Sequence, residues 1–217
     1  MNNKNLGKVL IGMGAVTLIT TMVDYFALVF PTSIKNPQWV FGVTQSISEI
    51  SVMPAIGLIF LLLGIGFAKD KMNEAPLNIV EKGAGILSLL FGLGFVVCAL
   101  MYAISAGGVE NTIVENLKNT NTQVKEQLNK VYDTYKAQID ESRLEELNEA
   151  FKKKTEEVDE QMMMGINQTN SKMQKTTFKT MLNLGFFALL NLYIFIRVFE
   201  LMDFFKYKVL KMKKAAN

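Results

Sequence analysis

Apolar residues gather in four long runs, at residues 6–30, 52–68, 84–105 and 180–202, which carry almost no charge. Each run has about 17 to 25 residues, enough for a helix to cross a hydrocarbon layer roughly 30 Å thick. The pattern therefore predicts an all-α integral membrane protein with four transmembrane helices. The first run follows a lysine-bearing start, as in a cleaved signal peptide, but no small-x-small cleavage site comes after it, and we favour a retained span.

The segment from 109 to 179 carries most of the acidic residues and many of the lysines, and two seams run through it. The first seam follows alternating three- and four-residue steps, which are typical of helices that pair in a coiled coil. The first seam comprises Val114, Leu117, Asn121, Val124, Leu128, Val131 and Tyr135. The second comprises Leu144, Leu147, Phe151, Val158 and Met162.

The two seams are out of phase, because the five residues from Ile139 to Leu144 rotate a helix by about 140°. We therefore expect a break near 140–143, where Ser142 as N-cap and Glu145 at the third helical position would form a capping box. Two arms of about 31 residues would then make an antiparallel helical hairpin about 45 Å long. The alternative is one continuous helix with a stutter. We favour the hairpin, because the chain must return to the membrane for its fourth run.

The stretch "NPQWVFGVTQSISEISVMP", Asn36 to Pro54, separates the first two runs. Asn36 is a good N-cap and Pro37 suits the first helical position, so a short helix is expected over 37–53. Its apolar face would contain Trp39, Val40, Val43, Ile47 and Ile50, and its polar face Gln45, Ser48 and Glu49. This pattern predicts an amphipathic helix in the membrane interface, with Trp39 at headgroup depth and a kink at Pro54.

Lysine and arginine near the ends of the runs indicate the orientation in the membrane. The N-terminus, the loop over 69–83 and the C-terminal tail are basic, whereas the connection over 31–51 has Lys35 alone. The positive-inside rule then predicts that both termini are cytoplasmic and that the hairpin lies on the periplasmic or lumenal side. Three regions are expected: three spans over 1–107, a hairpin over 108–178, and the fourth span with a tail over 179–217.

The tail beyond Arg197 mixes large apolar residues with lysines that would lie against the anionic lipid leaflet. These lysines are Lys206, Lys208, Lys211, Lys213 and Lys214. Nucleic-acid binding is the competing interpretation of a basic cluster. We disfavour it because the lysines alternate with bulky apolar side chains directly after a predicted span.

Candidate chemistry is sparse, and no catalytic, cofactor-binding or metal-ligating residue is predicted. The chain has no histidine, the usual zinc or haem ligand and general base, and its one cysteine, Cys98, lies in the third run. A disulfide within the chain is excluded. The string "IGMGAVT" at 11–17 resembles half of a dinucleotide fingerprint, but it lacks the third glycine and a preceding strand. We expect a protein that is not an enzyme.

Small residues in the runs are better explained as points where helices approach closely. The candidates are Gly12, Gly14, Gly57, Gly64, Gly85 and Gly92, with Ser88 and Gly92 as a small-xxx-small pair. Among polar residues, Arg197 is expected to pair with Glu200 one turn on, and Asn183 and Asn191 to form interhelical hydrogen bonds. A solute path through Asp24, Asn183 and Asn191 is the alternative, although a pathway usually shows more such groups.

A first span that ends in proline, "NPQWVFGVTQSISEISVMPAIGLIFLLLGIGF", "GGVENT" and a long polar helical region before a last span resemble a known family. This is the HpsJ-like family of cyanobacterial membrane proteins, named for hormogonium polysaccharide biosynthesis. The resemblance covers residues 6–115 in pattern, with Asn36, Pro37, Trp39, Pro54 and Gly57 as its most specific positions, and the rest in layout. It implies a plasma or thylakoid membrane and an accessory role linked to polysaccharide, with no catalytic residue.

We therefore expect a scaffold or assembly factor that contacts the lipid bilayer and other membrane proteins, including further copies of itself through the hairpin. A small accessory subunit of a photosynthetic or other thylakoid complex is the main alternative, and a transporter component is the other.

Overall fold

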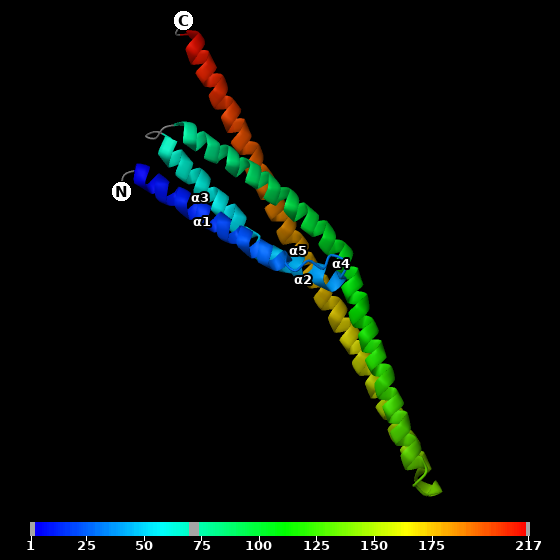
Figure 1. The fold of residues 1–217 in the computed structure, drawn as a ribbon. Helices are drawn as coiled ribbons and strands as arrows, with labels where there is room; N and C mark the ends of the chain where they lie inside the picture. Colours follow the sequence, from blue (N-terminus) through cyan, green and yellow to red (C-terminus); the bar gives the residue numbers. More distant parts are fainter. Residues whose placement is uncertain (1–2, 70–73, 216–217) are drawn as a thin grey trace. The chain divides into compact units, whose positions relative to one another are not determined.

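The structure is a computed structural model, and it describes residues 3–69 and 74–215, of which the side chains of 4, 69, 74–76 and 201–215 are left out. Its helices are α1 (Asn3–Val29), α2 (Pro37–Glu49), α3 (Val52–Lys69), α4 (Glu74–Lys136), the short 3-10 helix η1 (Glu141–Arg143) and α5 (Leu144–Ala215). Figure 1 shows no strand among the described residues, so the predicted all-α class is confirmed.

Four stretches of helix in the described part of the chain are long and apolar enough to cross a membrane, as the four apolar runs predicted. They are Asn5–Val29, Pro37–Ala68, Leu77–Lys136 and Glu141–Glu200. Both long helices extend well beyond the apolar runs: α4 contains the third run and the first seam, and α5 contains the second seam and the fourth run. Gly107 and Gly108 lie inside α4 without interrupting it. The chain divides into two compact units, Met1–Ala103 with Lys179–Asn217, and Ile104–Phe178.

In the first unit, α1 and α3 pack closely together, and glycines make this approach possible. A Cβ atom on Gly14 would lie 2.6 Å from the carbonyl oxygen of Gly57, and one on Gly64 would lie 2.8 Å from that of Gly7. The predicted close approach is therefore confirmed for Gly14, Gly57 and Gly64. It is wrong for Gly12, where a Cβ would meet nothing within 4 Å.

Helix geometry explains this difference between the glycines of α1. Two residues turn a helix by about 200°, so Gly12 lies on the side of α1 opposite Gly14. Gly7, which the sequence analysis missed, lies seven residues before Gly14 and shares its face. Gly57 and Gly64 have the same seven-residue spacing on α3. Two pairs of glycines therefore face each other and let two helix backbones touch.

The α4 and α5 segments of the first unit meet through a similar row of small residues. Ser88 is fully buried, and its Oγ donates a hydrogen bond to the main-chain carbonyl of Asn191 at 2.5 Å. A Cβ on Gly92 would lie 2.9 Å from Cγ of Leu192, and one on Gly85 would lie 2.9 Å from Cε2 of Phe199. The predicted packing role of Gly85, Ser88 and Gly92 is confirmed.

The start of α2 is the one expected from its sequence. Oδ1 of Asn36 accepts hydrogen bonds from the backbone N–H groups of Gln38 at 3.0 Å and Trp39 at 3.4 Å, and Pro37 occupies the first helical position. The helix ends at Glu49, four residues earlier than expected. The chain breaks one turn before Pro54, since proline cannot bond to the Ile50 carbonyl and its ring crowds it. Pro54 then falls in the first turn of α3, where backbone N–H groups have no intrahelical acceptor.

Candidate functional site

The α2 helix is covered by protein over the face that carries Val40, Thr44, Ile47 and Ser48. The Phe41 ring stacks on that of Tyr102 in α4, with ring centroids 4.7 Å apart. On the same side of the first unit, Oγ of Ser48 donates to the carbonyl oxygen of Thr180 in α5 at 3.4 Å. Ser48, which was expected on the polar face of this helix, is therefore buried against α5.

Local hydrogen bonds explain why small polar side chains can be buried on this helix. The Thr44 hydroxyl donates to the Val40 carbonyl at 2.7 Å, and the Ser51 hydroxyl donates to the Ser48 carbonyl at 2.7 Å. A hydroxyl that is satisfied within its own turn loses little when it leaves water. Sorting residues into apolar and polar faces does not show which polar residues will be buried in this way.

The structure places the predicted interaction residues of this helix in different surroundings. Ile47 belongs to the buried hydrophobic core of the first unit, and Val43 packs partly buried against it. Pro54 is fully buried, whereas Trp39 is half-buried at the start of α2. Three of the four are therefore packing residues, and half-buried Trp39 keeps some surface for a lipid headgroup or another protein.

In the second unit, the chain leaves α-helical geometry between Lys136 and Leu144. The expected capping box does not form, because Ser142 lies inside η1 and α5 begins at Leu144. Backbone bonds of the turn replace it: the N–H of Arg143 donates to the Asp140 carbonyl at 3.0 Å, and the N–H of Leu144 donates to the Glu141 carbonyl. A single continuous helix through this region is excluded.

A polar cluster joins α4 to α5 in the middle of the second unit. Nζ of Lys125 lies 2.6 Å from Oδ1 of Asp159, and Nδ2 of Asn121 donates to the same oxygen at 3.0 Å. These two donors come from successive turns of α4, so they fix the position of α5 along α4. We call Asn121, Lys125 and Asp159 the polar layer.

Aromatic and aliphatic contacts lie on either side of the polar layer. Towards the turn, the ring of Tyr132 lies 4.5 Å from that of Phe151, and the Tyr132 hydroxyl donates to Oδ1 of Asn148 at 2.5 Å. In the other direction, the side chain of Leu117 lies over Gly165, 3.7 Å from where a Cβ would stand. Later residues of α4 thus contact earlier residues of α5.

The predicted seam residues differ in how far their side chains are buried. On α5, a partly buried side chain is found at all five predicted positions, Leu144, Leu147, Phe151, Val158 and Met162. On α4, Leu117 and Leu128 are partly buried, but Val124 is exposed, as are Val131 and Tyr135 with 51% and 57% of their surface in contact with solvent. Sequence reasoning missed Lys125 and Tyr132, which lie one residue further along and make the contacts instead.

Protonation of Asp159 provides a test of the polar layer. The hydrogen bonds from Lys125 and then Asn121 lower the pKa of the Asp159 carboxyl from its ordinary 3.8. Its contribution to the pairing of α4 and α5 is fully present above the ordinary pKa and is lost as pH falls through the lower pKa of the folded protein.

We expect an NMR titration to give a midpoint for Asp159 below 3.8, and Lys125→Met to move it upward. Lys154→Met is the matched control, because Lys154 pairs with Glu157 on the same helix at 2.6 Å. An unchanged midpoint in Lys125→Met would show that Lys125 is not the cause of the shift.

The polar groups of the apolar runs lie in different surroundings. The Arg197 and Glu200 pair is confirmed at 3.0 Å, with Nε of Arg197 also donating to the Tyr193 hydroxyl at 3.0 Å. Asp24 is exposed on α1, and Asn191 is fully buried. The amide of Asn191 donates to the Phe187 carbonyl of its own helix at 2.8 Å, so the prediction of an interhelical bond from this side chain is wrong.

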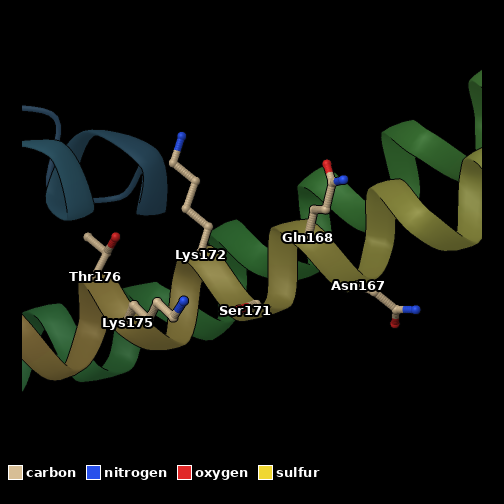
Figure 2. A pocket seen from close by; sticks show the side chains of 6 residues that line it. All are labelled: Asn167, Gln168, Ser171, Lys172, Lys175 and Thr176. Carbon is tan, nitrogen blue, oxygen red and sulfur yellow. The ribbon is translucent and has the colours of Figure 1, made fainter.

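One open hollow lies on α5, and its lining makes it a poor candidate for catalysis. Six residues of this single helix surround it: Asn167, Gln168, Ser171, Lys172, Lys175 and Thr176. In Figure 2 their side chains spread outward, Lys172 and Gln168 to one side of the helix and Asn167 to another. Across the described residues, no three histidine, cysteine, aspartate or glutamate side chains gather as a metal site would require.

The side chains of the predicted basic tail lie outside the described part of the chain. Lys206, Lys208, Lys211, Lys213 and Lys214 belong to the end of α5, and their side chains lie outside the described ones. Lys71, in the loop that was expected to be cytoplasmic, lies outside the described residues altogether.

Comparison with known proteins agrees with the resemblance seen in the sequence. The chain matches no curated protein and no solved structure. A family model described as HpsJ-like protein matches residues 5–202, which include all four apolar runs and both seams. The match extends far beyond the first half of the chain, where the sequence pattern is most specific. The chain therefore belongs to the HpsJ-like family.

Proposed function

We propose that the protein is a non-enzymatic membrane scaffold or assembly factor that presents a helical hairpin to other membrane proteins. The observation that carries this proposal is the polar layer together with the contacts around it, which join α4 and α5 on both sides of Asp159. Such contacts support an antiparallel coiled-coil hairpin with its turn at 137–143. A rigid pair of helices offers a long surface for protein contact and no enclosed pocket for a substrate.

Membership of the HpsJ-like family supports a link to polysaccharide biosynthesis or secretion. The protein would then hold or recruit enzymes of that process at a plasma or thylakoid membrane of the cyanobacterial kind. The chain contributes anchoring through its four apolar helices and selection of partners through the hairpin.

The proposed orientation places both termini in the cytoplasm and the hairpin on the opposite side. In a Cys98→Ala background, Ser142→Cys in η1 should react with a membrane-impermeant maleimide in intact spheroplasts. Lys82→Cys, near the start of α4 and before the third run, should react only after the membrane is opened. Reaction of Lys82→Cys alone in intact spheroplasts would reverse the proposed orientation.

The scaffold proposal is tested by recovering the protein from membranes in mild detergent and identifying what co-purifies. Phe151→Asp would place a charge against Tyr132 in the paired helices, and the set of co-purifying proteins should be lost or strongly reduced. Lys152→Asp is the control, because Lys152 is exposed and outside these contacts. Partners that remain equally bound to both variants would count against recruitment through the hairpin.

A further inference from the structure

One side of α4 in the second unit is exposed and carries no charge. Between Glu115 and Lys136, the eight residues of this side are Asn116, Thr120, Gln123, Val124, Gln127, Val131, Thr134 and Tyr135. All eight are exposed, and at about 100° per residue they fall within a sector of about 120°. We call them the neutral face.

The charged residues of the same segment lie elsewhere on the helix. They are Glu115, Lys118, Lys125, Glu126, Lys130, Asp133 and Lys136, and they fall within a separate sector of about 140°. A solvated helix face normally carries charges throughout, so their complete separation from the neutral face is unusual for a surface that only meets water.

The neutral face is more apolar than its residue types suggest. The Thr120 hydroxyl donates to the Asn116 carbonyl at 2.9 Å, and the Thr134 hydroxyl donates to the Lys130 carbonyl at 2.8 Å. Both hydroxyls are thus satisfied within α4, and their methyl groups remain for packing. With Val124, Val131 and Tyr135 they form an apolar stripe about 16 residues long, or about 24 Å of helix.

The heptad seam explains why the stripe exists. Val124, Val131 and Tyr135 continue the three- and four-residue steps from Leu117, but α5 contacts Lys125 and Tyr132 instead. The stripe therefore adjoins the contact between α4 and α5 and has the spacing that a further long helix requires. Three of the seven seam positions predicted on α4 are therefore left uncovered by α5.

We propose that the neutral face binds the neutral face of a second copy of this chain, so that two hairpins associate side by side. Two features favour a second copy over a different partner. A face without charges has no like-charge repulsion when it meets itself, which a two-fold contact requires, and it has no charge pattern to select another protein. The neutral face also adjoins the surface of α4 that contacts α5. Pairing of two neutral faces would therefore join two hairpins into one packed bundle of four helices. This inference rests on the proposed membrane hairpin.

Two copies in one membrane are related by an axis perpendicular to it, so their α4 helices run parallel and equivalent residues meet. In a Cys98→Ala background, Thr120→Cys and Val131→Cys should therefore form disulfide-linked dimers under mild oxidation in native membranes. Thr122→Cys and Asp133→Cys are matched controls, because each lies two residues on and on the opposite side of α4. Thr122 is a close control for Thr120, since its hydroxyl also donates within α4, to Lys118 at 3.1 Å.

Dimers at 120 and 131 with little at 122 and 133 would support the inference. Equal yields at all four positions, or a disulfide adduct whose mass is that of another protein, would overturn it. A Leu117→Cys, Gly165→Cys pair and a short bis-maleimide test the hairpin separately, because these positions adjoin within one chain. If that link forms within a chain and no dimer appears at 120 or 131, the second copy is excluded and the proposed hairpin stands. If it does not form, the hairpin itself is wrong.

Discussion

Replacing Gly14 by leucine is expected to destabilise the protein by about 3 kcal/mol or more, because α1 and α3 must move apart to admit any side chain. Even a Cβ at this position would lie 2.6 Å from the Gly57 carbonyl and 2.7 Å from the Leu61 amide nitrogen. Backbone atoms cannot rotate away as the end of a side chain can. The loss should appear as a lower unfolding temperature in detergent, followed by circular dichroism.

Gly12→Leu provides the matched control in the same helix. Nothing stands within 4 Å of a Cβ on Gly12, and leucine favours helix over glycine by up to about 1 kcal/mol. Its unfolding temperature should be unchanged or slightly higher. Gly14→Ala, the smallest possible addition, should lie between the native protein and Gly14→Leu. Equal losses at positions 12 and 14 would contradict the packing of α1 against α3.

The apolar runs predicted the helices well because their signal is long and local. Each run is nearly free of charge over about 17 residues or more, and only a helix satisfies its backbone in such a stretch. The extent of α4 and α5 was harder to predict, since nothing in the sequence marks whether a span and the arm beside it are one helix. Neither Gly107 nor Gly108 ends α4, because a glycine weakens a helix without removing a hydrogen bond.

The detailed contacts of the second unit were less predictable, for a geometric reason. A heptad pattern assumes 3.5 residues per turn, whereas a straight helix has about 3.6, so the contact line drifts along the surface. On α4 it passes from Asn121 to Lys125 and Tyr132, the positions just after Val124 and Val131. A lysine and a tyrosine were overlooked there because a seam is read from apolar residues, yet their stems and rings pack as well.

Hydrogen bonds to the main chain were the other feature hidden from the sequence. Ser88 reaches the carbonyl of Asn191, and Ser48 reaches that of Thr180, across more than 100 residues in each case. Both serines could be recognised as small residues, but the acceptor depends on which helices are neighbours. Which helices are neighbours is a property of the tertiary structure. The prediction of an interhelical bond from the Asn191 side chain was wrong for this reason, whereas the predicted packing of Ser88 was correct.

Leu128→Asp is expected to open the paired helices between the polar layer and the turn. Leu128 is partly buried between Lys125 and Tyr132, so it contributes part of the roughly 1.5 to 3 kcal/mol that a fully buried leucine side chain supplies. Leu128→Asp removes this contribution and places a carboxylate where it would have to be desolvated between the two helices. Because desolvation of a charge is costly, α4 and α5 are expected to separate there.

Hydrogen exchange provides the measurement for this variant, because separation exposes backbone amides that the paired helices protect. Amides from Leu128 through Phe151 should exchange much faster in Leu128→Asp, while those of α1 and α3 keep their native rates. Asn129→Asp adds the same charge at an exposed neighbour and should leave the native pattern intact. Native protection in Leu128→Asp would mean that this part of α4 is stable without α5, and the contacts of Tyr132 and Lys125 would then have no part in holding the two helices together.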